Sequence, residues 1–195
     1  GFPNLAIGPI GLAGAYLTSI MIKDDVHFLI AIVVGMALSA LLSAIIQKLV
    51  VEPLYNTVGG GDRGRIFVIY GTFGICLLFP AILMNVFRST MVTMRLPDLG
   101  AYHIFNVTLT GYQLLSFIIT IMTLIIAQLV LSKTKGGTHV RAVTQNPSLS
   151  YLMGIDVPKI YLLTSVIAGI CAYIGAILWG EIFSLELGSG MFFTL

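Results

Sequence analysis

The clearest chemical pattern in the sequence lies in the polar segment 132–159, which separates two long apolar runs. Asn146 suits the cap position before a helix, and Pro147 suits the first helical position, where a missing N–H costs nothing. Gly154 suits the left-handed position just beyond a helix end. These three residues predict a very short helix between 147 and 153.

The side chains of this short helix share one apolar face. Leu149, Leu152 and Met153 are three and four residues apart, so they lie side by side on a helix. Two turns of helix are marginal in water, so the helix needs something to dock against. One interpretation is helix-in-groove binding to a partner, and the other is a capped surface turn folded onto its own chain. The pattern alone leaves both open.

A second pattern is a stripe of polar side chains inside an otherwise apolar run at 111–131. Its members recur at three- and four-residue steps and therefore share a helix face: Gln113, Ser116, Thr120 and Thr123. Such a stripe either bonds to neighbouring helices or lines a polar pathway. Interhelical bonding is the favoured interpretation because it is common in membrane proteins.

Catalytic and metal chemistry have little support in the sequence. Cys76 and Cys171 both fall inside apolar runs, which is typical of inert core thiols, and a zinc site needs more ligands. The glycines at 59–61 lack the GxxxxGK[ST] pattern of a phosphate loop. We therefore predict no catalytic residue, no metal site and no enzyme activity in this chain.

Composition identifies the elements that position these residues. The 195 residues are 57% hydrophobic and only 9% charged, against roughly 25% charged in soluble domains. Runs of about 20 apolar residues can cross a bilayer. We predict an all-α, polytopic transmembrane helical bundle, formed by one domain over 1–195 that is part of a longer protein. Its spans are 3–22, 26–47, 66–87, 111–131 and 160–179.

Small residues mark several of these spans. The first run is rich in Gly and Pro, which favours either a discontinuous helix lining a path, near Asn4 and Gly8, or close helix packing. In the second run a packing seam is predicted by small residues spaced four apart, which are Ala31, Gly35, Ser39 and Ser43. In the fifth run a second packing seam is predicted by Ala168, Ala172 and Ala176. We expect 48–65 to be a flexible connector.

Positive charge predicts the topology. The segments 48–65 and 132–159 fall on the same side of the membrane and hold Lys48, Arg63, Arg65, Lys133, Lys135, Arg141 and Lys159. The opposite side holds Lys23, Arg88 and Arg95. The positive-inside rule therefore places segment 132–159 in the cytoplasm. None of the predicted spans contains Asp, Glu, Lys or Arg, so a proton-driven secondary carrier is disfavoured.

Two segments resemble the permease subunits of branched-chain amino-acid ABC transporters. The first matches a cytoplasmic loop of that family through Arg141, Ala142, Gln145, Asn146, Pro147, Leu152, Met153, Gly154, Ile155 and Asp156. The second, at the start of the chain, matches through Gly1, Asn4, Leu5, Ala6, Gly8, Gly14, Ala15 and Tyr16. The chain departs from the family at 7–9 and at 149–150, where it reads Ile-Gly-Pro and Leu-Ser.

The resemblance implies that segment 132–159 is a coupling loop that docks onto an ATPase subunit. Leu149, Leu152 and Met153 would form the docking face, between the helix-delimiting Asn146 and Gly154. Arg141 and Gln145 would flank it. The departure at 7–9 lies near the family's translocation path, to which Asn4, Gly8 and the polar stripe of 111–131 are assigned here.

The function implied is an ABC importer permease for branched-chain amino acids or a similar small polar solute, such as urea or an amide. The implied partners are ATPase subunits that bind the ATP, a related second permease, and a periplasmic or extracellular solute-binding protein. The chain itself would carry no cofactor and bind no nucleic acid. We expect it in the inner or plasma membrane of a prokaryote. The alternatives are a non-transporting scaffold subunit and a secondary carrier.

Overall fold

Long helices follow the apolar runs of the sequence. The computed structural model describes residues 4–57, 59, 61–87, 91–92, 100–104, 107–182 and 185–186. The long helices are α1 (Ile7–Lys23), α2 (Phe28–Ile46), α4 (Gly61–Phe87), α5 (Gly111–Lys133) and α8 (Val157–Ile182). Within the described residues, four helices have the length and composition to cross a membrane, and α1 is a shorter apolar helix of 17 residues. The prediction of an all-α polytopic membrane protein is confirmed.

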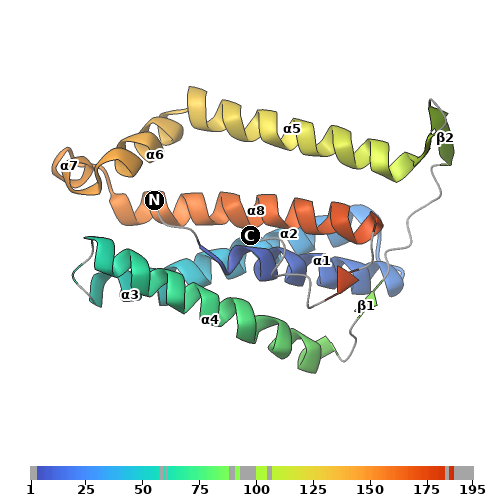
Figure 1. Ribbon diagram of the computed structural model, residues 1–195, viewed down its shortest axis with the longest axis horizontal. Coiled ribbons are helices and arrows are strands. Elements are labelled where there is room, and N and C mark those ends of the chain that lie inside the picture. The colour runs from blue at the N-terminus through green and yellow to red at the C-terminus, as the bar shows by residue number, and fades with distance from the viewer. Residues whose placement is uncertain are drawn as a thin grey trace.

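Three of these helices form the centre of the bundle. α1, α2 and α8 pack against one another, α4 lies against α1 on one side, and α5 runs along α8 on the other (Figure 1). α5 contributes least to the interior, because only 6% of its most apolar stretch is buried. The bundle therefore has a tightly packed core of three helices and two loosely attached outer helices.

Close packing explains the glycines of the first span. α1 is one continuous helix, and its residues from Gly8 to Tyr16 are all buried. A Cβ atom on Gly11 would lie 2.6 Å from the carbonyl oxygen of Ala172 on α8. The glycines of α1 thus let neighbouring backbones approach, which is the packing interpretation of this run rather than the discontinuous helix.

The predicted seam of small residues on α2 is buried along its length. Ser39 donates a hydrogen bond to the carbonyl of Ile10 on α1, at 3.3 Å. Ser43 lies 2.9 Å from the hydroxyl of Ser165 on α8, oxygen to oxygen. Each hydroxyl of the seam therefore bonds across a helix interface, where the alternative is an unsatisfied polar group.

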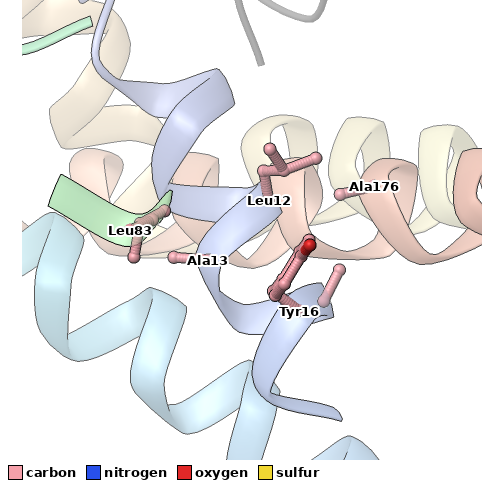
Figure 2. Packing of buried hydrophobic residues seen from close by; sticks show 6 residues of the cluster. Leu12, Ala13, Tyr16, Leu83 and Ala176 are labelled. Atoms are coloured by element: carbon pink, nitrogen blue, oxygen red, sulfur yellow. The ribbon is translucent and has the colours of Figure 1, made fainter. Parts of the chain in front are cut away.

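A second set of polar contacts joins the three central helices at the buried Tyr173. Its hydroxyl lies 2.8 Å from that of Thr18 on α1 and donates to the carbonyl of Ile32 on α2, at 2.9 Å. A cluster of buried apolar side chains joins α1 to α4, where Leu83 of α4 packs with Leu12, Ala13 and Tyr16 of α1 (Figure 2).

Two segments contain more helix than the sequence analysis predicted. The predicted flexible connector at 48–65 instead continues α2 as the π-helix η1 (Gln47–Val51) and then α3 (Glu52–Thr57), and α4 begins at Gly61. Segment 132–159 contains α6 (Lys135–Gln145) in addition to the short α7 (Pro147–Leu152). The connector prediction was wrong because a helix can continue into polar sequence beyond the membrane.

Short strands lie at the other end of the bundle. β2 (Ala101–Ile104) and β3 (Val107–Thr110) form an antiparallel hairpin, and β1 (Met91–Val92) pairs with β4 (Leu185–Glu186). We call this the hairpin end, and the end with α3, α6 and α7 the basic end (Figure 1). The structure thus gathers the predicted cationic segments 48–65 and 132–159 at one end. Gly1, Arg88, Arg95 and residues 187–195 lie outside the described residues.

Candidate functional site

The short helix predicted at the centre of segment 132–159 is present with both of its predicted ends. The side-chain oxygen of Asn146 accepts a hydrogen bond from the N–H of Leu149, at 3.0 Å. At the other end Gly154 has a φ of 82°, and the N–H of Ile155 donates to the carbonyl of Ser150 at 3.1 Å. This pair of features is a Schellman motif, which satisfies the last carbonyls of the helix. α7 is therefore delimited by its own sequence.

The apolar face of α7 points away from the protein. Leu149 is 55% exposed, Leu152 81% and Met153 75%, whereas Ser150 on the inner face is buried. Tyr151, which the sequence analysis did not select, is 70% exposed. Large apolar side chains with this exposure, on a helix capped at both ends, form a surface suited to an apolar groove on another molecule.

α6 precedes α7 in the chain and packs against it. Its N-cap Thr134 accepts a hydrogen bond from the N–H of Gly137, at 3.0 Å, and its inner residue Val143 is 2% exposed. The two predicted flanking residues, Arg141 and Gln145, are exposed on this helix. α6 and α7 thus form one helical unit with an inner apolar side and an outward side that carries all the residues predicted to couple.

The junction between α7 and α8 is fixed by Asp156. Its carboxylate accepts from the N–H of Lys159 at 3.2 Å and forms an ion pair with the Lys159 ammonium at 2.7 Å. The hydrogen bond from the Lys159 side chain lowers the pKa of Asp156 below its usual value. The carboxylate is therefore ionised at neutral pH, and it caps α8 as the sequence indicates.

An open groove separates α7 from α3 at the basic end. Its volume is about 620 Å³, and Val51 and Tyr55 line one wall while Tyr151 and Leu152 line the other. The groove lies beside the exposed face of α7.

A second, smaller cavity of about 250 Å³ lies where α1, η1, α6 and α8 meet. Its polar lining includes Asn4, Gln47 and Thr144. Gln47 is 6% exposed and lines both the cavity and the groove, as does Tyr161. We call this space the Gln47 cavity.

Comparison with known proteins gives a family. Residues 1–193 match the profile of the branched-chain amino acid transport system permease component. The chain belongs to this permease family. It is similar to a probable branched-chain amino acid transport permease protein, LivH, of Methanocaldococcus jannaschii, with 28% identity over 180 residues, which is 87% of this chain and 54% of that protein. The chain therefore spans about half the length of that curated relative. No solved structure matches it.

The residues that the sequence assigned to a translocation path lie apart in this permease. Asn4 lines the Gln47 cavity at the basic end, and Gly8 is buried in the first turn of α1. Gln113 lies near the hairpin end, where its side-chain oxygen accepts from the N–H of Thr110 at 3.2 Å. Their role in transport stays a prediction.

Two hydroxyls of the polar stripe of α5 are bonded within their own helix. The hydroxyl of Thr120 donates to the carbonyl of Ser116, and that of Thr123 donates to the carbonyl of Ile119, both at 2.8 Å. Ser116 is buried, whereas Thr120 is exposed. Since each hydroxyl keeps its lone pairs, the stripe retains acceptors for a neighbouring helix or for a polar solute.

Gln47 is the residue that sequence reasoning missed most clearly. It continues the buried series of α2 after Ser39 and Ser43 with the same spacing of four. A large polar residue at the next position of a small-residue seam was the available signal. For Tyr151 the sequence offered no such signal, because its position falls outside the apolar face formed by Leu149, Leu152 and Met153.

The cap of α7 is testable by removing one side-chain oxygen. Asn146→Ala is expected to destabilise α7 by about 1 kcal/mol, because the N–H of Leu149 loses its acceptor. Amide hydrogen exchange of residues 149–153 in the full-length permease would then be several times faster. Asn146→Asp retains an acceptor and is the control. Equal exchange rates in the two variants would contradict the capping role.

Proposed function

We propose that this permease is the membrane-spanning subunit of an ABC importer for branched-chain amino acids or a similar small polar solute. The family membership of residues 1–193 supports transport as the role. The proposal concerns the whole protein, of which this chain corresponds to about half by comparison with the archaeal relative.

The observation that carries the proposal is the outward apolar face of α7 at the basic end. A membrane protein that takes energy from a separate ATPase needs a rigid contact outside the bilayer. α7 is held in shape by caps at both ends, and its exposed Leu152 and Met153 offer the apolar contact. The cationic residues around it favour the cytoplasmic side, where ATP is available.

The proposed partners follow from the separation of the membrane subunit from the ATPase. We propose that ATPase subunits bind and hydrolyse the ATP, that a related second permease completes the pathway, and that a binding protein delivers the solute on the far side. The chain would then need no cofactor of its own. The proposed setting is the inner or plasma membrane of a prokaryote.

Reconstitution tests the proposal directly. The full-length permease, its candidate ATPases and second permease are placed in proteoliposomes with the binding protein, and uptake of labelled leucine, valine and urea is measured. ATP-dependent uptake of any of them supports an importer, and the preferred solute identifies the class. A complex that assembles and hydrolyses ATP but takes up none of them contradicts the proposed solutes. Failure of any ATPase to bind would favour a non-transporting scaffold.

A further inference from the structure

The open groove between α3 and α7 carries a charge opposite to that of its surroundings. Among the described residues that line it, the one charged side chain is the partly buried Glu52. The charge of Arg65 acts on Tyr161, a lining residue, but Arg65 itself does not line the groove. The other cations of the basic end also lie outside it: Lys48, Arg63, Lys133, Lys135, Arg141 and Lys159. The groove is therefore a negative site within a positive surface.

A π-helical turn places Glu52 in the groove. The N–H of Glu52 donates to the carbonyl of Gln47, five residues earlier, where a regular helix bonds four residues back. Gln47 and Glu52 accordingly both line the groove. Lys48, four residues before Glu52, is exposed outside the groove. The Glu52 carboxylate forms no ion pair with a residue that the structure describes, so it is left for a group from another molecule.

Tyrosine side chains line the groove beside this carboxylate, and they are Tyr55, Tyr151 and Tyr161. Tyr55 is held in place by the start of α4. Its hydroxyl accepts from the N–H of Gly61 at 3.3 Å, and a Cβ atom on Gly64 would lie 3.0 Å from its ring. Tyrosine rings attract cations, and the planar guanidinium of arginine both stacks on such rings and pairs with a carboxylate. The lining therefore matches an arginine side chain.

The groove is continuous with the proposed docking face of α7. Leu152 belongs to that face and also lines the groove, and its neighbour Tyr151 lines the groove as well. Both are largely exposed, at 81% and 70%. A protein that covers Leu152 therefore also reaches the groove, so the ATPase that is proposed to bind α7 is the partner placed to fill it.

We propose that the groove receives an arginine side chain of the ATPase subunit, whose guanidinium pairs with Glu52 beside the tyrosine rings. This inference rests on the proposed function and adds a second, reciprocal contact to it. The groove volume of about 620 Å³ leaves ample room for one such side chain. The ATPase would then hold both walls of the groove. One wall continues α2 and the other leads into α8, so both central helices would be connected to the ATPase.

Glu52→Gln in the full-length permease tests the ion pair, because it removes the charge and keeps the shape of the side chain. Association with the ATPase is expected to weaken about tenfold or more, since the guanidinium loses its carboxylate. Asp24→Asn removes the same charge from an exposed position at the hairpin end and should leave association within about twofold. The melting temperature of the permease alone should stay the same in both variants.

The outcomes of this experiment separate the groove contact from the proposed function. If Glu52→Gln binds the ATPase as tightly as the native permease while Leu152→Asp does not bind it, the groove contact is wrong and the importer function stands. If no ATPase binds the native permease, the proposed function fails and the groove contact fails with it.

A photo-crosslinker placed in the groove identifies its occupant. In a full-length permease with Cys76→Ala and Cys171→Ala, Ser148→Cys adds an exposed thiol to the lining, and benzophenone maleimide is attached there. Irradiation of the assembled complex is expected to join it to an ATPase peptide that contains an arginine. Adducts confined to lipid, or to another segment of the permease, would overturn the proposal.

The arginine found in this way completes the test. Its replacement by glutamine should weaken association as much as Glu52→Gln does, and the two changes together should weaken it no further, because either one removes the same ion pair. Full additivity of the two effects would show that the arginine and Glu52 act separately, which contradicts the proposed pair.

Discussion

Gly14→Ala is expected to break the contact between α1 and α2. A Cβ atom on Gly14 would lie 2.6 Å from the carbonyl oxygen of Gly35 and would also overlap the hydroxyl of Ser39. The first neighbour is backbone, so a rotamer change does not relieve the overlap and the helices must separate. Overpacking of this kind costs roughly 1–3 kcal/mol or more. The melting temperature of the full-length permease in detergent should therefore fall by several degrees.

A second glycine provides the matched control. Gly175 lies on α8, and a Cβ atom there would meet nothing within 4 Å. Gly175→Ala adds the same methyl group and should stabilise the helix by up to about 1 kcal/mol, because alanine has the higher helix propensity. The two variants are expected to move the melting temperature in opposite directions. Similar shifts in both would mean that close approach at Gly14 is not what holds α1 to α2.

The transmembrane architecture could be predicted because hydropathy acts on long runs. Each predicted span became a helix, and the seam at Gly35 and Ser39 is buried as its spacing indicated. The two ends of α7 could also be predicted, since Asn146 and Gly154 act on their immediate neighbours. In all of these cases the deciding interactions are local or repeat along the sequence.

The remaining helices depended on contacts that are distant in sequence or independent of hydropathy. Gly136 and Gly137 argue against a helix, yet α6 forms, because Gly137 packs against the backbone of Leu131 and Thr134 caps the helix. Beyond Ile46 the chain stays helical as far as Thr57. Two residues later Gly59 has a φ of 78°, in the left-handed region. Hydropathy ends a membrane span, whereas a glycine in the left-handed region ends a helix.

The Gln47 cavity could not be predicted from the sequence, for a related reason. Its walls come from α1, η1, α6 and α8, so their meeting point depends on the tertiary fold. Asn4 could be singled out from its motif, but no pattern joined it to Gln47 or Thr144. Which polar residues share a space is a property of helix packing rather than of any one segment.

Leu152→Asp with Met153→Asp is expected to abolish transport by preventing ATPase docking. Both side chains are more than 70% exposed, at 81% and 75%, so the permease itself should fold and melt normally. A partner groove that buries them would instead receive two carboxylates. Anchors of this kind contribute at least about 2 kcal/mol each, so association should weaken by several hundredfold or more. Copurification of a tagged ATPase and ATP-driven uptake measure the effect.

The control must add charge at the same end without touching α7. His139 is exposed on α6, and His139→Asp should leave association within about twofold because rim charges contribute little. Leu152→Asp alone then isolates the apolar contact at equal added charge. If Leu152→Asp and His139→Asp behave alike, the apolar face of α7 does not bind the ATPase. Arg141 and Gln145, which lie exposed on α6, would then be the next residues to substitute.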